Sequence, residues 1–137
     1  MKLMNNKRSQ VSLRIHSSIL SCDIITKALG VEPTKCLDKG AKIHRNNAKI
    51  RERSMWILES QLPEEETLDK HIDKLLIRID KMGDRFSSLL EQVDCDLFCF
   101  FSTENGQGSI GLDKLLLQKL AKYPLDIIID LYLSEDD

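Results

Sequence analysis

The chain has 137 residues, a typical length for one domain and too short for two ordinary ones. Its hydrophobic content of 42% and charged content of 31%, with six glycines and three prolines, exclude a fibrous chain and favour a folded globule over a disordered one. The formal net charge is −2, but residues 1–53 carry twelve Lys/Arg and four Asp/Glu and are net +8, which leaves residues 54–137 net −10.

The N-terminus and the longest apolar runs argue against export and membrane insertion. Residues 1–8 lack the apolar segment of a signal peptide, and the run at residues 127–129 is far shorter than a membrane span. We therefore expect a cytoplasmic protein with no membrane contact. The opposite charges of the two halves either hold the halves together or offer a basic surface to an anionic partner.

The first half of the chain predicts three strands and a helix. Apolar and polar residues alternate at 11–16, the pattern of a strand with one buried face. A short helix follows, because Ser21 can cap its start and Gly30 can end it. A broken strand at 35–43 and a strand at 54–60 come next, before a proline ends the extended segment.

The second half opens with the clearest amphipathic helix, whose apolar residues repeat at three- and four-residue intervals over 68–82. The periodicity continues past Gly83, so either one bent helix or two short helices fit the pattern. The remaining predicted elements are strands at 97–101, 109–111 and 125–133 and a helix at 112–120.

This order of elements predicts an α+β fold. Its first six elements match a ferredoxin-like β-α-β-β-α-β antiparallel sheet with helices on one face, and a C-terminal β-α-β extension follows. We expect a flexible N-terminus at 1–9, a single α+β domain at 10–133 and an acidic tail at 134–137. The open face of such a sheet needs a cover, which either a dimer partner or the long loop could provide.

Four cysteines, Cys22, Cys36, Cys95 and Cys99, show no C-x-x-C spacing, so we expect free, buried thiols. On a strand, the Cα atoms of Cys95 and Cys99 would lie roughly 13 Å apart, which excludes a disulfide between them. Cys22 could lie in the first turn of a helix, where the dipole lowers a thiol pKa. Without a histidine base placed beside it, we interpret Cys22 as a packing residue.

The other titratable residues form no recognisable catalytic or metal-binding pattern. The three histidines, His16, His44 and His71, are scattered. Of the paired acids Asp94/Asp96 and Asp126/Asp130, we expect Asp94, Asp96 and Asp126 at solvated strand ends. Asp130, inside an apolar strand, either faces solvent or needs a buried partner. We therefore predict no catalytic residue, no metal and no cofactor.

One segment, Gly106-Gln107-Gly108-Ser109-Ile110-Gly111, formally matches the G-x-G-x-x-G fingerprint, and Asp130 follows at roughly the spacing of the ribose-binding acid. However, the polar residues 102–105 separate the strand from the glycines, and the helix begins after Gly111, so its N-terminus would not meet a pyrophosphate in the usual way. We interpret the segment as a flexible turn. A small-ligand or nucleotide-binding loop is the alternative.

Residues 45–53 have no apolar periodicity and a high positive charge, so we expect an exposed hairpin loop within the basic segment 35–53. This segment lacks the aromatic residues or recognition helix of a nucleic-acid surface. The alternatives are a solvated loop, a contact with an acidic protein or a second copy of the chain, and, least favoured, nucleic acid. The predicted interaction surface consists of Lys42, Arg45, Lys49, Arg51 and Arg53.

Several short motifs occur together along the chain. They are the alternating strand at 11–16, Ala28-Leu29-Gly30-Val31-Glu32-Pro33-Thr34, Lys39-Gly40, Ser54-Met55-Trp56 before Leu58-Glu59-Ser60, the helix around His71, and the closing Leu125-Asp126-Ile127 to Asp130-Leu131-Tyr132. This combination resembles DUF4279, a family of uncharacterised bacterial proteins. The resemblance implies a compact α+β domain and a family turn at Asn105-Gly106-Gln107-Gly108. It transfers no catalytic residue.

Charge asymmetry without a catalytic constellation favours a non-enzymatic protein-interaction module, of an immunity or regulatory type. Its partner would be another protein or a second copy of the chain, and we do not expect nucleic acid. The alternative function, from a different class, is a protein that binds a small ligand or nucleotide through the loop at residues 106–111.

Overall fold

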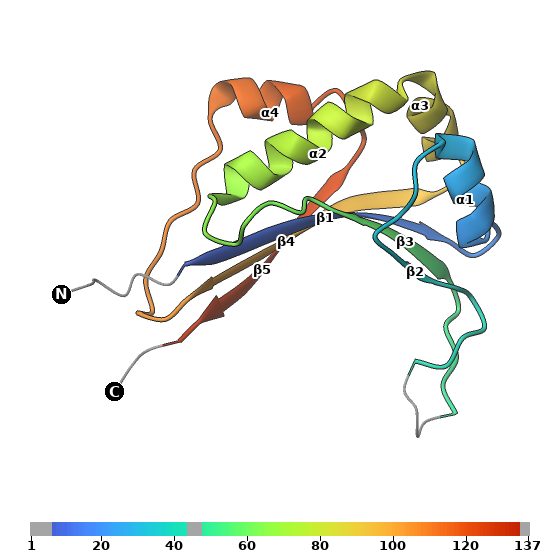
Figure 1. Ribbon diagram of the computed structural model, residues 1–137, viewed down its shortest axis with the longest axis horizontal. Helices are drawn as coiled ribbons and strands as arrows, with labels where there is room; N and C mark the ends of the chain where they lie inside the picture. The colour runs from blue at the N-terminus through green and yellow to red at the C-terminus, as the bar shows by residue number, and fades with distance from the viewer. Residues whose placement is uncertain (1–6, 44–47, 135–137) are drawn as a thin grey trace.

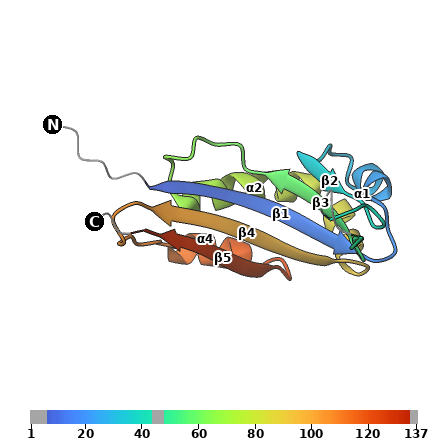
Figure 2. The ribbon, with the colours of Figure 1, turned by 90° about the horizontal axis from the view of Figure 1, so that it is seen from below.

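A computed structural model describes residues 7–43 and 48–134 of the chain. Within these residues, five strands form one sheet in the order β2-β3-β1-β4-β5, and four helices lie on a single face of it (Figure 1, Figure 2). The chain therefore has a two-layer architecture of mixed α and β structure, and the predicted α+β class is confirmed.

The first strand lies at the centre of the sheet. β1 (Arg8–Ser17) pairs antiparallel with β3 (Ser54–Glu59) on one side and with β4 (Asp94–Thr103) on the other, and the short β2 (Lys35–Leu37) pairs with β3. Buried and more exposed residues alternate along β1, because successive side chains of a strand point to opposite faces. The predicted strand is confirmed, and it begins before the expected domain boundary at residue 10.

The first helix, α1 (Cys22–Leu29), begins and ends where the sequence predicts. The side chain of Ser21 accepts a hydrogen bond from the first turn, and Gly30 ends the helix in the left-handed conformation, with φ of 70°. The buried indole of Trp56 on β3 donates its N–H to the hydroxyl of Thr26 at 2.9 Å. This bond fixes α1 against the sheet.

A glycine separates the next two helices, α2 (Leu68–Met82) and α3 (Asp84–Leu90). Gly83 has φ of 59° and ψ of −134°, a backbone conformation that glycine adopts readily and other residues rarely do. Of the two alternatives that the periodicity left open, the structure therefore has two helices. The apolar stripe of α2 packs across β1 and fills much of the core.

The last strand changes the sheet from antiparallel to mixed. β5 (Asp126–Leu133) pairs parallel with β4 at the edge of the sheet, and α4 (Lys114–Leu120) lies in the connection between them. The expected antiparallel pairing holds for β1 to β4, but the expectation of a separate β-α-β extension is wrong, because β5 joins the same sheet. Residues 109–111 form no strand, and β4, α4 and β5 form the β-α-β unit themselves, because parallel neighbours need a crossover connection.

The core lies between the sheet and the helices. In the described part of the chain, no helix has the length and apolar character needed to cross a bilayer. Most of the expected flexible N-terminus and acidic tail falls at 1–6 and 135–137, outside the described residues.

In the core between the sheet and the helices, the largest fully buried side chains are those of Trp56, Phe86, Leu13, Ile15, Ile25, Leu29, Leu58, Ile72, Leu75, Leu76, Ile79 and Leu97.

Candidate interaction surface

The sheet face that the helices leave uncovered is called here the open face, and Figure 2 views the sheet from that side. Strand alternation and the pairing registers determine which side chains lie on it. It combines apolar and charged side chains, and most of them are at least partly exposed. Its members are Arg8, Gln10, Ser12, Arg14, His16, Lys35, Leu37, Met55, Ile57, Glu59, Asp94, Asp96, Phe98, Phe100, Ser102, Asp126, Ile128, Asp130 and Tyr132.

A charged cluster lies at the centre of the open face. Arg14 donates two hydrogen bonds to the Asp96 carboxylate, from Nε at 2.7 Å and from Nη2 at 3.1 Å, and His16 Nε2 lies 3.0 Å from Asp96 Oδ2. The Asp96 residue is only 7% exposed, so the expectation of a solvated strand end is wrong for it. A buried carboxylate needs such partners, and β1 supplies both of them.

The cluster also determines the ionisation of Asp96. Burial acts to raise the pKa of Asp96, but the hydrogen bonds from His16 and Arg14 and the charge of Arg14 outweigh burial, so the pKa lies below its ordinary value. Asp96 is therefore ionised over the physiological range. Because both oxygens are already bonded to neighbouring side chains, the arrangement suits a structural ion pair better than a general base.

Aromatic side chains lie on the same open face as this cluster, and one of them contacts it. The guanidinium of Arg14 lies 4.2 Å from the centre of the Phe98 ring, and the rings of Phe100 and Tyr132 lie 5.3 Å apart. A shallow cavity of about 330 Å³ runs over Arg14 and Phe98 toward Ile57. The centre of the sheet thus offers apolar area beside charges that are already paired.

The basic segment forms a hairpin that projects beyond the sheet, away from the helices (Figure 1). β2 ends at Leu37, so the strand predicted at 35–43 is shorter than expected. The hairpin is closed by backbone bonds from Gly40 N–H to the Arg51 carbonyl at 2.9 Å and from Ile43 N–H to the Lys49 carbonyl at 3.0 Å. The predicted exposed hairpin is confirmed at its base, and its residues 44–47 lie outside the described residues.

The structure separates the five predicted interaction residues into groups. Lys42 and Lys49 are exposed on the hairpin and Arg51 is half-buried beside them, whereas Arg45 lies outside the described residues. Arg53 instead reaches the sheet, where its Nη2 donates to Asp94 Oδ2 at 2.6 Å. Arg53 and Asp94 join the basic and acidic halves of the chain, as do Arg14 and Asp96.

A hollow of about 790 Å³ lies between the hairpin and the end of the open face. Exposed Ile43 and Ile50 line it from the hairpin, and Met55 and His16 line it from the sheet. Lys49 and Arg51 add positive charge around these apolar side chains, Glu52 adds one negative charge, and Arg53 is paired with Asp94. The hollow could therefore receive a segment that carries both acidic and apolar side chains.

The glycine-rich loop is explained by its own packing. A Cβ atom at Gly108 would lie 2.8 Å from the Phe101 ring, and Gly106 has φ of 72°. The side chain of Asn105 accepts from the Gln107 N–H at 3.1 Å, which closes the turn. Since α4 begins only at Lys114, the glycines do not lead directly into a helix N-terminus, in agreement with the interpretation as a turn.

Ser60 and His71 form a buried hydrogen-bonded pair. Ser60 Oγ and His71 Nδ1 are 2.6 Å apart, and His71 Nε2 lies 3.1 Å from the Pro63 carbonyl. Because the carbonyl can only accept, Nε2 carries the proton and Nδ1 accepts from Ser60. His71 is 0% exposed and Ser60 1%, so this pair has a structural role and cannot reach a substrate from its present position.

Acidification is expected to destabilise the protein through His71. Burial lowers the pKa of His71 more than the Pro63 and Glu66 backbone bonds raise it, so below about pH 6.5 the unfolded chain binds a proton that the folded chain does not. Stability is therefore lost as pH falls from about 6.5 toward the lower folded pKa. Urea unfolding at pH 7.5 and 5.5 should show a larger loss for the native sequence than for His71→Gln, whereas equal losses would contradict the assignment.

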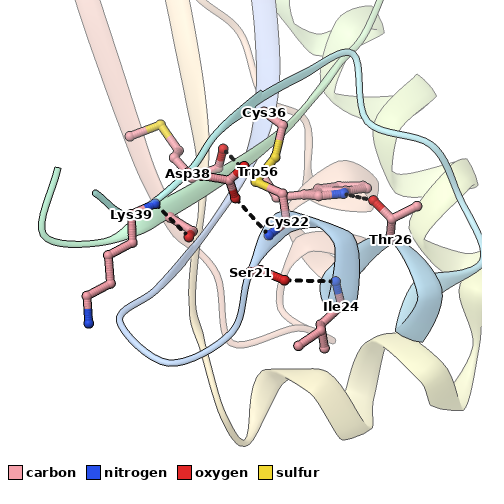
Figure 3. Close-up of a disulfide and its surroundings, with 10 residues drawn as sticks. Ser21, Cys22, Ile24, Thr26, Cys36, Asp38, Lys39 and Trp56 are labelled. Carbon is pink, nitrogen blue, oxygen red and sulfur yellow. Dashed lines mark hydrogen bonds between the residues drawn. A yellow bond between two sulfur atoms is a disulfide. The ribbon is translucent and has the colours of Figure 1, made fainter. Parts of the chain in front are cut away.

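The expectation of four free thiols is wrong for two of them. Cys22, at the start of α1, and Cys36, in β2, form a disulfide with their Cα atoms 6.2 Å apart (Figure 3). Cys95 and Cys99 are free and buried, as predicted. Burial raises the pKa of both free thiols, to about 12 for Cys99, so neither is a ready nucleophile.

Asp38 lies beside this disulfide. Its Oδ1 accepts a hydrogen bond from the Cys22 backbone N–H at 3.2 Å, and its carboxylate and the two sulfurs lie within 4.8 Å of one another (Figure 3). Two thiolates and a carboxylate are ligands that zinc takes, so the reduced pair together with Asp38 could supply three of them. In the oxidised pair the sulfurs bind each other instead.

Asp130 is half-buried on the open face of β5. The hydrogen bond from the Tyr132 hydroxyl to Asp130, together with the negative charge of that carboxylate, raises the pKa of Tyr132. The acid thus has a local partner at the surface and is not buried in the core. Of the two alternatives for Asp130, the surface position is correct.

Sequence reasoning missed the Arg14, Asp96 and His16 cluster. From the sequence alone, Arg14 and His16 are only the polar members of an alternating strand, and Asp96 is expected to be a solvated acid. The residues lie about 80 positions apart, as the separations of 82 and 80 show, and only the β1–β4 register brings them together. The sequence signal that indicates this cluster is charge, because cationic side chains alternate along β1 and acidic side chains alternate along β4.

Comparison with known proteins gives one match. The family model described as "Domain of unknown function (DUF4279)" matches residues 6–134, which is nearly the whole chain. No curated protein and no solved structure matches the chain. The resemblance inferred from the short motifs is thus confirmed, and the chain belongs to the DUF4279 family.

Proposed function

We propose that the chain is a non-enzymatic protein-interaction module of immunity or regulatory type, which binds an acidic segment of another protein in the hollow between the hairpin and the open face. The observation that carries this proposal is the composition of the hollow. Exposed Ile43 and Ile50 stand beside Lys49 and Arg51, and the remaining charged lining is Glu52 and the Arg53 that is paired with Asp94. Apolar side chains provide affinity when buried by a partner, and the surrounding cations select an acidic one.

The organisation of the titratable groups supports a binding role over catalysis. Asp96 is bonded to Arg14 and His16, and the buried His71 is bonded to Ser60. Each of these groups is thus engaged by neighbouring side chains, whereas a general base must reach the proton that it removes. The exposed apolar area and the charge around the hollow instead support the proposal of contact with another surface.

We further propose that β1 to β4 with their helices form a ferredoxin-like unit to which β5 has been added. The antiparallel pairing of β1 with both β3 and β4, and of β2 with β3, supports this description. In such a unit the helices cover one face and leave the other for contacts. The hairpin between β2 and β3 is then an elaboration at one end of that contact surface.

Charge reversal tests the proposed function. The variant Lys42→Glu, Lys49→Glu and Arg51→Glu should lose a partner that the native protein captures by cross-linking from a cell extract, and native capture should weaken as salt is raised. Arg53 is left unchanged because it holds Asp94. A control with the same charge change, Lys81→Glu, Lys114→Glu and Lys122→Glu, places its substitutions on exposed helical and post-helical positions.

The control variant should retain the captured protein. If the hairpin variant retains it as well, the hollow is not the contact surface and the proposal is wrong. If both variants lose it, overall charge and not this surface governs the interaction, which also contradicts the proposal. Circular dichroism of each variant checks that the fold is preserved.

A further inference from the structure

β5 is a long apolar strand at one edge of the sheet. It pairs with β4 on one side, and six of its side chains, those of Ile127, Ile128, Ile129, Leu131, Tyr132 and Leu133, are 37% to 54% exposed. The opposite edge, β2, has only three residues. Proteins normally cover, shorten or charge such an edge, because its unpaired N–H and C=O groups accept another strand.

The direction of the unpaired backbone groups follows from one hydrogen bond. Ser134 N–H donates to the Thr103 carbonyl of β4 at 3.1 Å. Because backbone groups alternate sides along a strand, even-numbered residues of β5 bond toward β4. The N–H and C=O groups of Ile127, Ile129 and Leu131 therefore point away from the sheet, where a further strand would bind them.

Side chains alternate in the same way. Register with β4 places Ile127, Ile129 and Leu131 on the helix side of the sheet, and Asp126 and Asp130 on the open face. An added strand would meet a continuous apolar row on the helix side. On the open face it would meet two carboxylates, so its own charges decide which registers are allowed.

We propose that the added strand is β5 of a second copy of this chain, paired antiparallel about a twofold axis at Ile129. In this register Ile127 lies opposite Leu131 of the second copy, and Ile129 lies opposite its counterpart. Asp126 then lies opposite Tyr132, and Asp130 opposite Ile128. Such an isologous contact uses one self-complementary patch on both copies.

Charge distinguishes this register from its neighbours. Shifting the axis to Ile128 places Asp126 opposite Asp130 of the second copy, and shifting it to Asp130 places the two Asp130 side chains opposite each other. Like charges directly opposite in an antiparallel pair are destabilising. Of the three central registers, only the one at Ile129 avoids this repulsion, and it also pairs the outward backbone groups through about six hydrogen bonds.

The resulting dimer is one continuous sheet with all helices on the same side. The two hairpins lie at its far ends, because β2 is at the edge opposite to β5. The dimer therefore leaves the hollow at each hairpin accessible. This inference does not depend on the proposed function, which concerns the other end of the sheet.

Sedimentation equilibrium tests the dimer. The native protein should sediment as two chains of 15.7 kDa each, and both Ile129→Lys and Ile129→Asp should sediment as one. Each substitution places like charges opposite each other at the axis. Mixing the two variants should restore the dimer, since lysine then lies opposite aspartate, and this restoration is specific to the register at Ile129.

The matched control is Ile24→Lys, which replaces an apolar side chain of similar exposure, 50%, on α1. This variant should remain dimeric. A monomeric native protein overturns the proposal, as does a dimer that persists in Ile129→Lys. If the mixed variants stay monomeric while circular dichroism shows both to be folded, the proposed register is wrong.

Discussion

Replacing Asp96 with alanine is expected to lower the free energy of unfolding by about 3 kcal/mol, because removing one member of a buried ion pair leaves the other without compensation. The side chains of Arg14 and His16, which bind this carboxylate, are only 20% and 16% exposed. In Asp96→Ala both would remain at the centre of the open face without their acceptor. Urea unfolding at pH 7 measures the loss.

Asp94 provides the matched control on the same strand. Its side chain is 78% exposed and pairs with Arg53, itself 44% exposed, so Asp94→Ala should cost less than about 1 kcal/mol. The double variant Arg14→Met with Asp96→Leu, which removes both charges, should be less destabilised than Asp96→Ala. If the two aspartate variants lose equal stability, the central cluster is not the buried ion pair described here.

Loss of the Cys22–Cys36 disulfide is expected to cost about 3 kcal/mol under oxidising conditions. The bond closes a loop with a sequence separation of 14, and cross-linking a loop of that length removes about this much conformational entropy from the unfolded chain. Cys36→Ser is the better variant, because Cys22 is 5% exposed and its replacement would also disturb packing. Thermal and urea unfolding of the oxidised protein measure the difference.

Reduction provides the internal control for this experiment. With excess dithiothreitol, the native sequence should unfold at nearly the same urea concentration as Cys36→Ser, while the variant itself should be unaffected by the reductant. If reduction leaves the native protein unchanged, the two cysteines do not stabilise the fold through a covalent bond. Mass spectrometry after alkylation shows directly which thiols are free in each sample.

Local patterns determined the parts of the fold that the sequence predicted. The alternation along β1, the cap at Ser21, the stop at Gly30 and the three- and four-residue spacing in α2 act within a few residues of chain. Each of these patterns belongs to a single helix or strand and reflects which side of that element faces solvent. These elements were therefore predicted in type, with errors of a few residues at their ends.

Long-range pairing determined the parts that the sequence did not predict. The parallel alignment of β5 with β4 depends on the crossover through α4, and short apolar runs such as residues 109–111 carry no signal of whether a strand will find a partner. Similarly, Cys22 meets Cys36 only because the start of α1 lies beside β2. The absence of C-x-x-C spacing favours free thiols for both and carries no information about this contact.

The same difference between local patterns and long-range pairing explains why only part of the candidate surface was predicted. A run of cations identified the hairpin directly, so Lys42 and Lys49 were placed correctly on an exposed loop. Arg53 belongs to the same run, yet its interaction with Asp94 depends on the distance between the ends of β3 and β4. The apolar part of the hollow around Met55 could not be predicted from composition alone, because its position depends on the strand register.

The central position of β1 has a consequence for synthesis of the protein. β1 leaves the ribosome before the other described strands, but its partner residues in β4 extend to Ser102, opposite Arg8. Its backbone pairing with β4 must therefore wait until most of the described chain has been translated, and closing so long a loop slows folding. Until α2 has also been translated, the apolar side chains of Val11, Leu13 and Ile15 lack the helix that covers them, and such exposed apolar surface promotes aggregation during synthesis.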